Sequence, residues 1–171
     1  AYMLALGNQT DLTHGDMLSY FAALPGIETL GIYIEGFKDL DGLAFAKAVR
    51  KAVLNGKQIV VYNSGRTAPG QGGVMGHTAS IAGGLTLFES VVRHAGAIVA
   101  EDFNSFDDLF YIAGVLQGKK IGGRRIGAIS GAGFEAVSMA DAILAEGGGM
   151  EMGVLAPATV ERVMMPALIQ H

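Results

Sequence analysis

Short apolar runs alternate along this chain with longer amphipathic segments, and this alternation constrains the fold more than any other feature. Two of the short runs, IVVY at 59–62 and IGAI at 126–129, are continuously apolar instead of alternating with polar residues. Strands that are buried on both faces have this pattern, and such strands are typical of parallel sheets. The sequence therefore predicts an α/β fold, with an open parallel sheet that carries helices on both faces.

The pattern places the elements as follows. The expected strands are Tyr2–Leu6, Thr29–Ile34, Gln58–Asn63, Ala97–Ala100, Arg125–Ser130 and Met150–Val154. The expected helices are Thr13–Ala23, Leu40–Leu54, Thr78–Arg93, Ser105–Leu116, Gly133–Glu146 and Pro157–Ile169. Ligands of open parallel sheets bind beyond the carboxyl ends of the strands, so a site is expected in the loops that follow them.

A stretch at 118–123 (GKKIGG) is predicted to be a linker, because an amphipathic segment ends before it and a new apolar run begins after it. We expect one domain over 1–117 and a second over 124–171. The second block holds about two strands and two helices, too little to close a core of usual domain size. We therefore expect the chain to be a piece of a longer polypeptide.

Composition excludes several classes of protein. Half of the 171 residues are hydrophobic and 16% are charged, which excludes a disordered chain. The net charge of −4 argues against a nucleic-acid partner, since phosphate backbones need clustered cations. The absence of cysteine excludes disulfides and thiolate chemistry. No apolar run approaches the ~20 residues that span a bilayer, and no residues show metal-ligand spacing. We expect a cytoplasmic protein with neither a membrane segment nor a metal site.

The 26 glycines gather at the ends of apolar runs, and the densest loop lies at 64–84 (SGRTAPGQGGVMGHTASIAGG). His77 stands where this loop is expected to meet the next helix, with small residues on both sides. A nucleophilic imidazole needs open space for an incoming phosphorus atom, and glycines provide it. A purely structural histidine fits the spacing equally well. The other histidines, at 14, 94 and 171, lie at expected helix ends or at the chain end and are interpreted as surface or capping residues.

Other candidate residues also follow expected strands. Glu35 could orient an imidazole and make its far nitrogen more nucleophilic, or could be an ordinary strand-end acid. The N–H groups around Gly7 and Asn8, and those of the turn from Gly131 to Gly133, could cradle a phosphate or simply form turns. Arg66 could pair with a phosphate or an acyl carboxylate, or be held by a neighbouring acid.

Four segments in order along the chain resemble the ligase region of ADP-forming acyl-CoA synthetases and the carboxyl-terminal domain of the succinyl-CoA synthetase alpha subunit. They are GNQTD at 7–11, YIEG at 33–36, SGRTAPG at 64–70 and GHTASIAGG at 76–84. The segment RRIGAISGAGFEAVSMADAIL at 124–144 resembles the start of the ligase domain that follows. The resemblance implies a flavodoxin-like first domain and the start of a second, similar one.

The resemblance also implies an acid–thiol ligase. Acyl-CoA and phosphate give acyl phosphate and CoA; the phosphoryl group then passes to a histidine and on to ADP. By motif His77 is that histidine, and Glu35 is the carboxylate that orients it. The phosphate would be held by Gly7, Asn8, Gly76, Gly131 and Gly133. We therefore expect His77 and Glu35 to lie within hydrogen-bond reach, roughly 2.6–3.2 Å or through one water.

By the same resemblance, CoA, ADP or ATP, phosphate and Mg²⁺ would be used through domains outside this chain. These are a CoA-binding domain and an ATP-grasp domain or subunit. The isolated chain is expected to bind no cofactor and to be inactive. An apolar face on the expected helix Pro157–Ile169 suggests docking onto the first domain or a homodimer.

Two departures from the family pattern bear on the phosphate site. An earlier strand with a Ser-x-Ser-Gly motif is absent, and Glu135 places a negative charge near the turn from Gly131 to Gly133. This charge supports an alternative, a noncatalytic flavodoxin-like binding or regulatory module. A flavin or corrinoid carrier is disfavoured, because Met75 stands where Asp-x-His-x-x-Gly needs Asp and the glycine-rich loops have no aromatic residue.

Overall fold

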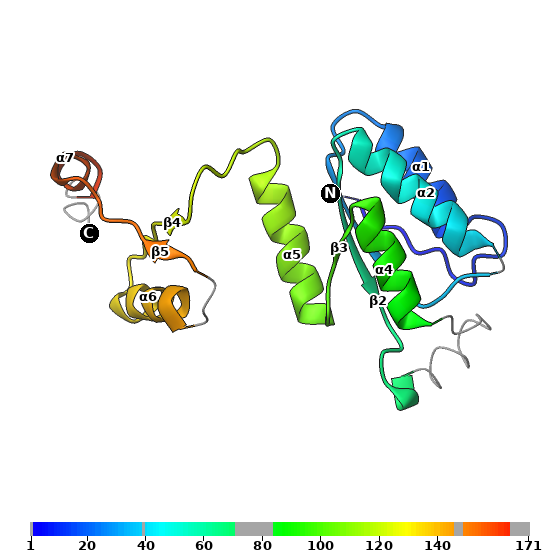
Figure 1. The fold of residues 1–171 in the computed structure, drawn as a ribbon. Helices are drawn as coiled ribbons and strands as arrows, with labels where there is room; N and C mark the ends of the chain where they lie inside the picture. The colour runs from blue at the N-terminus through cyan, green and yellow to red at the C-terminus, as the bar shows by residue number, and fades with distance from the viewer. Residues whose placement is uncertain (1, 39, 71–83, 146–148, 165–171) are drawn as a thin grey trace. The chain divides into compact units, whose positions relative to one another are not determined.

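A computed structural model describes residues 2–38, 40–70, 84–145 and 149–164 of the chain (Figure 1). The chain divides into two compact units, Ala1–Lys119 and Lys120–His171, and each is described by itself. Within the described ranges no helix is both long enough and apolar enough to cross a membrane.

The first unit is built on three parallel strands in the order β1-β2-β3. They are β1 (Thr29–Ile34), β2 (Gln58–Asn63) and β3 (Ile98–Val99). The central strand is paired on both sides, since Val61 aligns with Ile32 of β1 and with Val99 of β3. The predicted parallel sheet is confirmed, and β1 and β2 have the bounds that their apolar runs predict.

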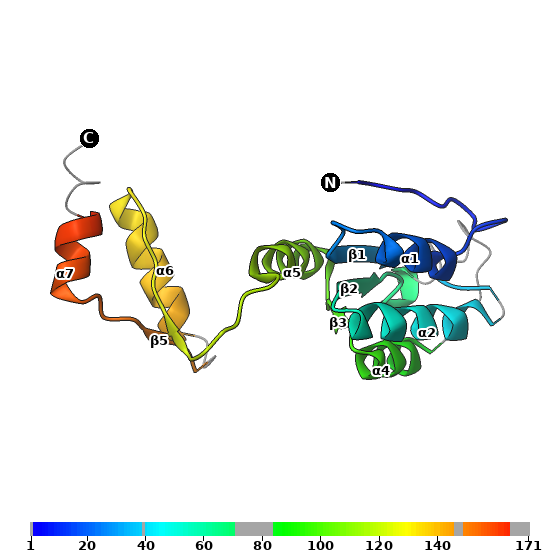
Figure 2. The same ribbon diagram turned by 90° about the horizontal axis from the view of Figure 1, so that it is seen from above.

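Helices cover both faces of this sheet, as Figures 1 and 2 show. α2 (Asp41–Leu54) and α4 (Leu85–Ala95) pack on one face, and α5 (Phe103–Leu116) packs against β1 and β2 on the other. α1 (His14–Ala23) packs mainly on α2. Two of these helices begin at capping boxes, one formed by Thr13 with Asp16 and one by Asp102 with Ser105, which satisfy amide groups of the first turn.

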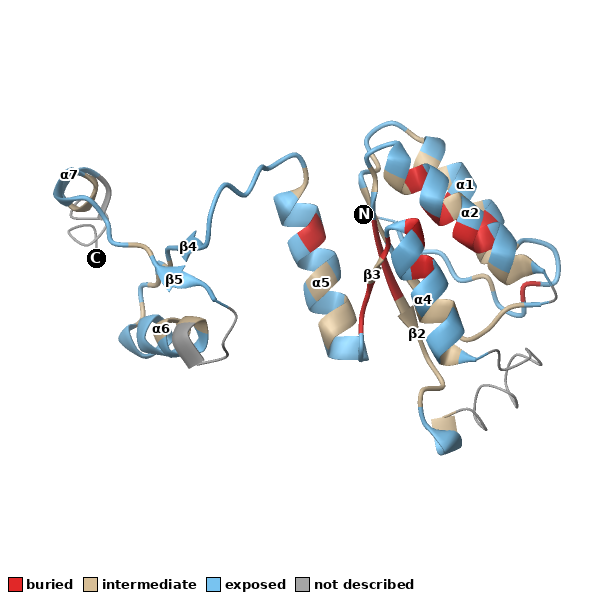
Figure 3. Ribbon diagram, in the orientation of Figure 1, coloured by how far each residue is buried: buried red, intermediate tan, exposed pale blue. Residues whose placement is uncertain are grey.

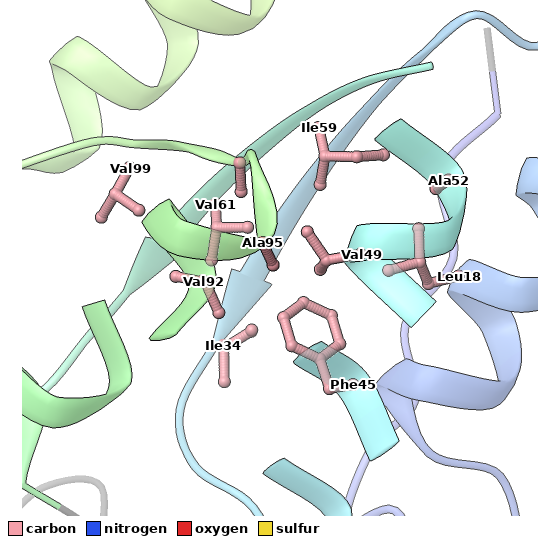
Figure 4. Packing of buried hydrophobic residues seen from close by; sticks show 11 residues of the cluster. Leu18, Ile34, Phe45, Val49, Ala52, Ile59, Val61, Val92, Ala95 and Val99 are labelled. Carbon is pink, nitrogen blue, oxygen red and sulfur yellow. The ribbon is translucent and has the colours of Figure 1, made fainter. Parts of the chain in front are cut away.

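The core of the first unit lies between the sheet and the helices α1, α2 and α4. Phe45 is fully buried there among Ile34 and Val49 (Figure 4). Val60 and Val61 are both 0% exposed although successive strand residues point to opposite faces, so β2 is buried on both sides. This is the arrangement that the run IVVY predicts. Most of α5, by contrast, is exposed or half-buried (Figure 3).

The second unit has a parallel pair of short strands, β4 (Arg125–Ile126) and β5 (Glu151–Met152). Its helices are α6 (Gly133–Ala145), α7 (Pro157–Thr159) and a π-helical turn η1 (Val160–Met164). No residue described in this unit is buried. Both strands are shorter than predicted. Among the described residues each is paired with one neighbouring strand only, and an isolated pair of strands is marginally stable.

One predicted strand is wrong. Residues Tyr2–Leu6 have no regular secondary structure, and Tyr2 and Met3 are 84% and 101% exposed. An apolar run becomes a strand only where a neighbouring strand takes up its N–H and C=O groups, and no described strand pairs with this one. The predicted helix Thr78–Arg93 has its described part at Leu85–Ala95, with Gly84 as its N-cap.

Gly96 ends α4 in the left-handed region at φ +102°, and a Cβ atom there would lie 2.8 Å from Cγ1 of Val53. Gly56 also has a positive φ, +83°, but faces open space. Alanine costs about 1–2 kcal/mol in either place through backbone strain. Gly96→Ala should lower the free energy of unfolding by roughly 1–3 kcal/mol more than Gly56→Ala, because its Cβ atom would overlap the Val53 side chain.

Urea unfolding of both variants measures this difference. Adding Val53→Ala should remove most of the extra cost at Gly96, because it removes the overlapping methyl group. Equal losses in Gly56→Ala and Gly96→Ala would contradict the packing described here.

Candidate functional site

The carboxyl ends of the three strands are joined to one another by backbone hydrogen bonds. The amide of Ser64, just after β2, donates to the carbonyl of Ile34 at 2.8 Å. The amide of Ala100, just after β3, donates to the carbonyl of Val61 at 2.9 Å. The loops that follow the strands therefore start side by side at one edge of the sheet, where open parallel sheets bind ligands.

Glu35 is the first residue after β1 and is half-buried at this edge. The hydroxyl of Tyr33 lies 3.5 Å from its Oε1 atom. Burial lowers the pKa of the nearby His14, and the charge of the Glu35 carboxylate partly opposes this shift. A carboxylate here can accept a hydrogen bond from a group in the adjoining loops.

The loop at 7–13 is fastened to the loop that carries Glu35. Gln9 is 6% exposed, and its Nε2 atom donates to the carbonyl of Gly36 at 3.1 Å. The Nζ atom of Lys38 donates to the carbonyl of Gln9 at 2.7 Å. The structure thus brings the turn at Gly7 and Asn8, whose residues are exposed, next to the Glu35 loop.

His14, the first residue of α1, completes this connection. Its Nδ1 atom lies 2.7 Å from Oε1 of Gln9, and its ring meets the ring of Phe37 edge-on at 6.1 Å. Burial lowers the pKa of His14 below its ordinary value of 6.5, although the backbone of Tyr33 and the charge of Glu35 oppose the shift. The unfolded chain therefore binds more protons just below pH 6.5, and the folded state loses stability as the pH falls through that range.

Arg66 is held by a neighbouring acid. Its Nη1 atom lies 2.6 Å from Oε1 of Glu89 on α4, and 3.5 Å from the carbonyl of Ala100 after β3. The paired side chains are 24% and 17% exposed. Of the roles open to Arg66, this ion pair is the one that the structure contains, and it ties the loop after β2 to α4. Contact of Arg66 with a phosphate or acyl group stays a prediction.

His77 and Gly76 lie outside the described residues. The expected approach of His77 to Glu35 therefore stays a prediction.

The turn from Gly131 to Gly133 in the second unit leads into α6, and an acidic side chain is held beside it. Ser130 Oγ accepts from the amide of Ala132 at 3.1 Å and donates to Oε2 of Glu135. The carboxylate of Glu135 is thus fixed in the first turn of α6, where the helix dipole also favours a negative group. Phosphate binding by Gly131 and Gly133 would compete with this charge and stays a prediction.

Sequence reasoning missed the residues that hold the site together: Gln9, His14, Lys38 and Glu89. Only Gln9 had a signal, because it lies inside the segment GNQTD. Glu89 is 23 residues from Arg66, and no local pattern indicates such a pair. No group of three or more metal-binding side chains occurs among the residues that the structure describes.

Comparison with known proteins gives one family, described as the succinyl-CoA ligase like flavodoxin domain, which matches residues 1–116. The chain is similar to an ADP-forming acetate–CoA ligase of Methanocaldococcus jannaschii, with 33% identity over 81% of this chain and 19% of that protein. It is also similar to the alpha subunit of ADP-forming acetate–CoA ligase II of Pyrococcus furiosus, with 28% identity over 94% of this chain and 33% of that subunit. The chain therefore spans a third or less of the length of these relatives.

Solved structures give the same likeness. Acetyl-coenzyme A synthetase 1 of Ca. Korarchaeum cryptofilum, in complex with phosphate and ADP, matches with a TM-score of 0.63 and 30% identity. That match covers 81% of this chain and 29% of the synthetase. The apo form of the synthetase matches with a TM-score of 0.66 and 25% identity over 95% of this chain and 34% of that chain.

The ion pair between Arg66 and Glu89 can be measured with a double-mutant cycle of Arg66→Gln and Glu89→Gln. Because the pair is mostly shielded from water, we expect a coupling free energy of about 1–3 kcal/mol in unfolding experiments. Arg93 provides the matched control, since it lies 3.8 Å from the same carboxylate but is 49% exposed. Its coupling should be about 0.3–0.5 kcal/mol. Equal coupling free energies for Arg66 and Arg93 would contradict the conclusion that the ion pair of Arg66 with Glu89 holds the loop after β2 against α4.

Proposed function

Because this chain belongs to the family of succinyl-CoA ligase like flavodoxin domains, we propose that it is the phosphoryl-carrying part of an ADP-forming acyl-CoA synthetase. The observation that carries the proposal is the clustering at the carboxyl edge of the first unit. Glu35, the turn at Gly7 and Asn8, and the start of the loop after β2 are fastened together there. The matched relatives are ADP-forming acetate–CoA ligases, which supports this reaction class.

The proposed reaction has three steps. A phosphate oxygen attacks the acyl-CoA thioester, so that a carbon–oxygen bond replaces the carbon–sulfur bond and CoA leaves. An imidazole nitrogen of His77 attacks the phosphorus of the acyl phosphate, and the carboxylate of the free acid leaves. The terminal oxygen of ADP then attacks the phosphohistidine, the phosphorus–nitrogen bond breaks, and ATP forms. Each step is reversible, so the same residues serve synthesis of acyl-CoA.

Glu35 has a specific part in this scheme. Its carboxylate would accept a hydrogen bond from the ring nitrogen of His77 that does not react, which fixes the tautomer and stabilises the positive charge of the phosphorylated ring. The N–H groups at Gly7, Asn8 and Gly76 would hold the phosphoryl oxygens. The glycines leave the phosphorus open to three successive partners: the acyl group, the imidazole and the nucleotide.

We also propose the division into a phosphohistidine domain at 1–117, a linker at 118–123 and part of a second ligase-like domain at 124–171. In that second domain Gly131 and Gly133 would supply further N–H groups. CoA, nucleotide and Mg²⁺ would be bound by a CoA-binding domain and an ATP-grasp domain or subunit. These substrates fit a cytoplasmic enzyme. A homodimer contact through the segment that begins at Pro157 belongs to the same proposal.

A second candidate is a noncatalytic module with the same fold. It is favoured by one observation, the carboxylate of Glu135 fixed through Ser130 at the turn where phosphate would bind. The two candidates differ in whether the chain accepts a phosphoryl group.

Glu35→Gln tests the proposed role, because it removes the charge and nearly keeps the shape. In the complete synthetase, phosphorylation of the enzyme by radioactive ATP should slow by roughly 10²–10⁴-fold. Glu28→Gln is the matched control, since Glu28 is an exposed acid just before the amino end of the same strand, and it should react at the unmodified rate. Full activity of Glu35→Gln would reduce Glu35 to an ordinary strand-end acid.

A further inference from the structure

Gln9 is the one buried polar side chain among the described residues, and its backbone is also strained. Its φ of +52° lies in the left-handed region, which a residue with a side chain rarely adopts because of backbone strain. Burying its amide adds a further cost unless every polar atom finds a partner. Both ends of the amide and the backbone carbonyl are bonded, to Gly36, His14 and Lys38. A conformation with these costs persists only where its surroundings determine it.

The hydrogen bonds of Gln9 fix the protonation of His14. The carbonyl of Gly36 can only accept, so the amide nitrogen of Gln9 must face it. The amide oxygen then faces His14, and the Nδ1 atom of the imidazole must carry a hydrogen and donate it. The reversed amide would place two acceptors 3.1 Å apart, without a hydrogen between them. His14 is therefore a donor at Nδ1 in every charge state that keeps this contact.

His14 also contacts the segment that follows the first strand and carries Glu35. The ring of Phe37 meets the imidazole edge-on, with 6.1 Å between the ring centroids, and the charge of Glu35 opposes the effect of burial on the pKa of His14. The charged amine of Lys38 donates to the backbone carbonyl of Gln9 and does not contact the imidazole directly in any described hydrogen bond. Asp16, on the same helix as His14, is occupied by Thr13. The imidazole thus contacts the loop at 7–13 and the segment 33–37 at once.

We propose that His14 is a positioning residue that locks the loop at 7–13 to the Glu35 loop through Gln9. It sets the place of the Glu35 carboxylate and of the turn at Gly7 and Asn8. Its consequence for catalysis rests on the proposed function, whereas the lock itself does not. Loss of the Nδ1 donor should release Gln9 from its strained conformation and free both loops.

Nitrogen NMR of the 171-residue chain tests the lock without any catalytic assay. At neutral pH the ring of His14 should carry its hydrogen on Nδ1, the less common tautomer in water. Gln9→Leu should return it to the Nε2 tautomer. As the pH falls, the amide signals of Gln9 and of Gly36–Lys38 should shift together with the protonation of His14. An Nε2 tautomer in the unmodified chain, or loop signals that ignore His14, would overturn the proposal.

Two substitutions separate positioning from general stability. The side-chain amide of His14→Asn can donate in place of Nδ1, whereas His14→Leu cannot. In the complete synthetase, His14→Leu should slow phosphorylation by roughly 10–100-fold, the effect of a small misplacement, and His14→Asn should restore most of the rate. In a Glu35→Gln background, His14→Leu should slow phosphorylation little further, because both substitutions act through the carboxylate of Glu35.

The exposed His94→Asn is the matched control and should change neither the NMR signals nor the rate. Equal defects in His14→Leu and His14→Asn, or full additivity with Glu35→Gln, would show a merely structural role. If the unmodified synthetase is not phosphorylated at all, the proposed function fails. The tautomer and loop measurements then decide alone whether His14 locks the two loops.

Discussion

Burial of β2 on both faces is the constraint on which the first unit depends. Val60 and Val61 point to opposite sides of the sheet, and each is completely removed from water. Only a strand with parallel neighbours on both edges and helices above and below can satisfy such a run. Because the strands are parallel, their carboxyl ends meet at one edge. The need to bury β2 on both faces therefore also determines the edge of the sheet at which the loops that follow the strands gather.

The loops at that edge are held by polar contacts between residues far apart in sequence. Gln9 reaches the loop after β1, and Arg66 reaches Glu89 on α4. Both contacts are at least partly shielded from water, which makes them stronger than surface pairs. Loops fastened in this way can present carboxylate and N–H groups at fixed positions, as catalysis by a phosphorylated imidazole requires.

The sequence predicted what depends on local pattern. The bounds of β1 and β2 and the layered α/β arrangement follow from apolar periodicity, and the family follows from motifs in order along the chain. Tyr2–Leu6 has the same periodicity but is no strand, because pairing depends on a neighbour that the pattern does not contain. His14 appeared to be a surface residue because its ring contact with Phe37, 23 residues further along the chain, depends on how the loops fold back. The role of Glu35 and His77 came from the motif, and only the place of Glu35 falls on described residues.

We propose above all that His77 carries the phosphoryl group and that Glu35 orients its imidazole. The most direct measurement is mass-spectrometric mapping, under alkaline conditions, of the complete synthetase after incubation with acetyl phosphate. Trypsin cuts after Arg66 and Arg93, so the peptide at 67–93 contains His77 as its single histidine. The account predicts one acid-labile phosphoryl group on this imidazole. A phosphoryl group on another residue, or none on a competent enzyme, would contradict it.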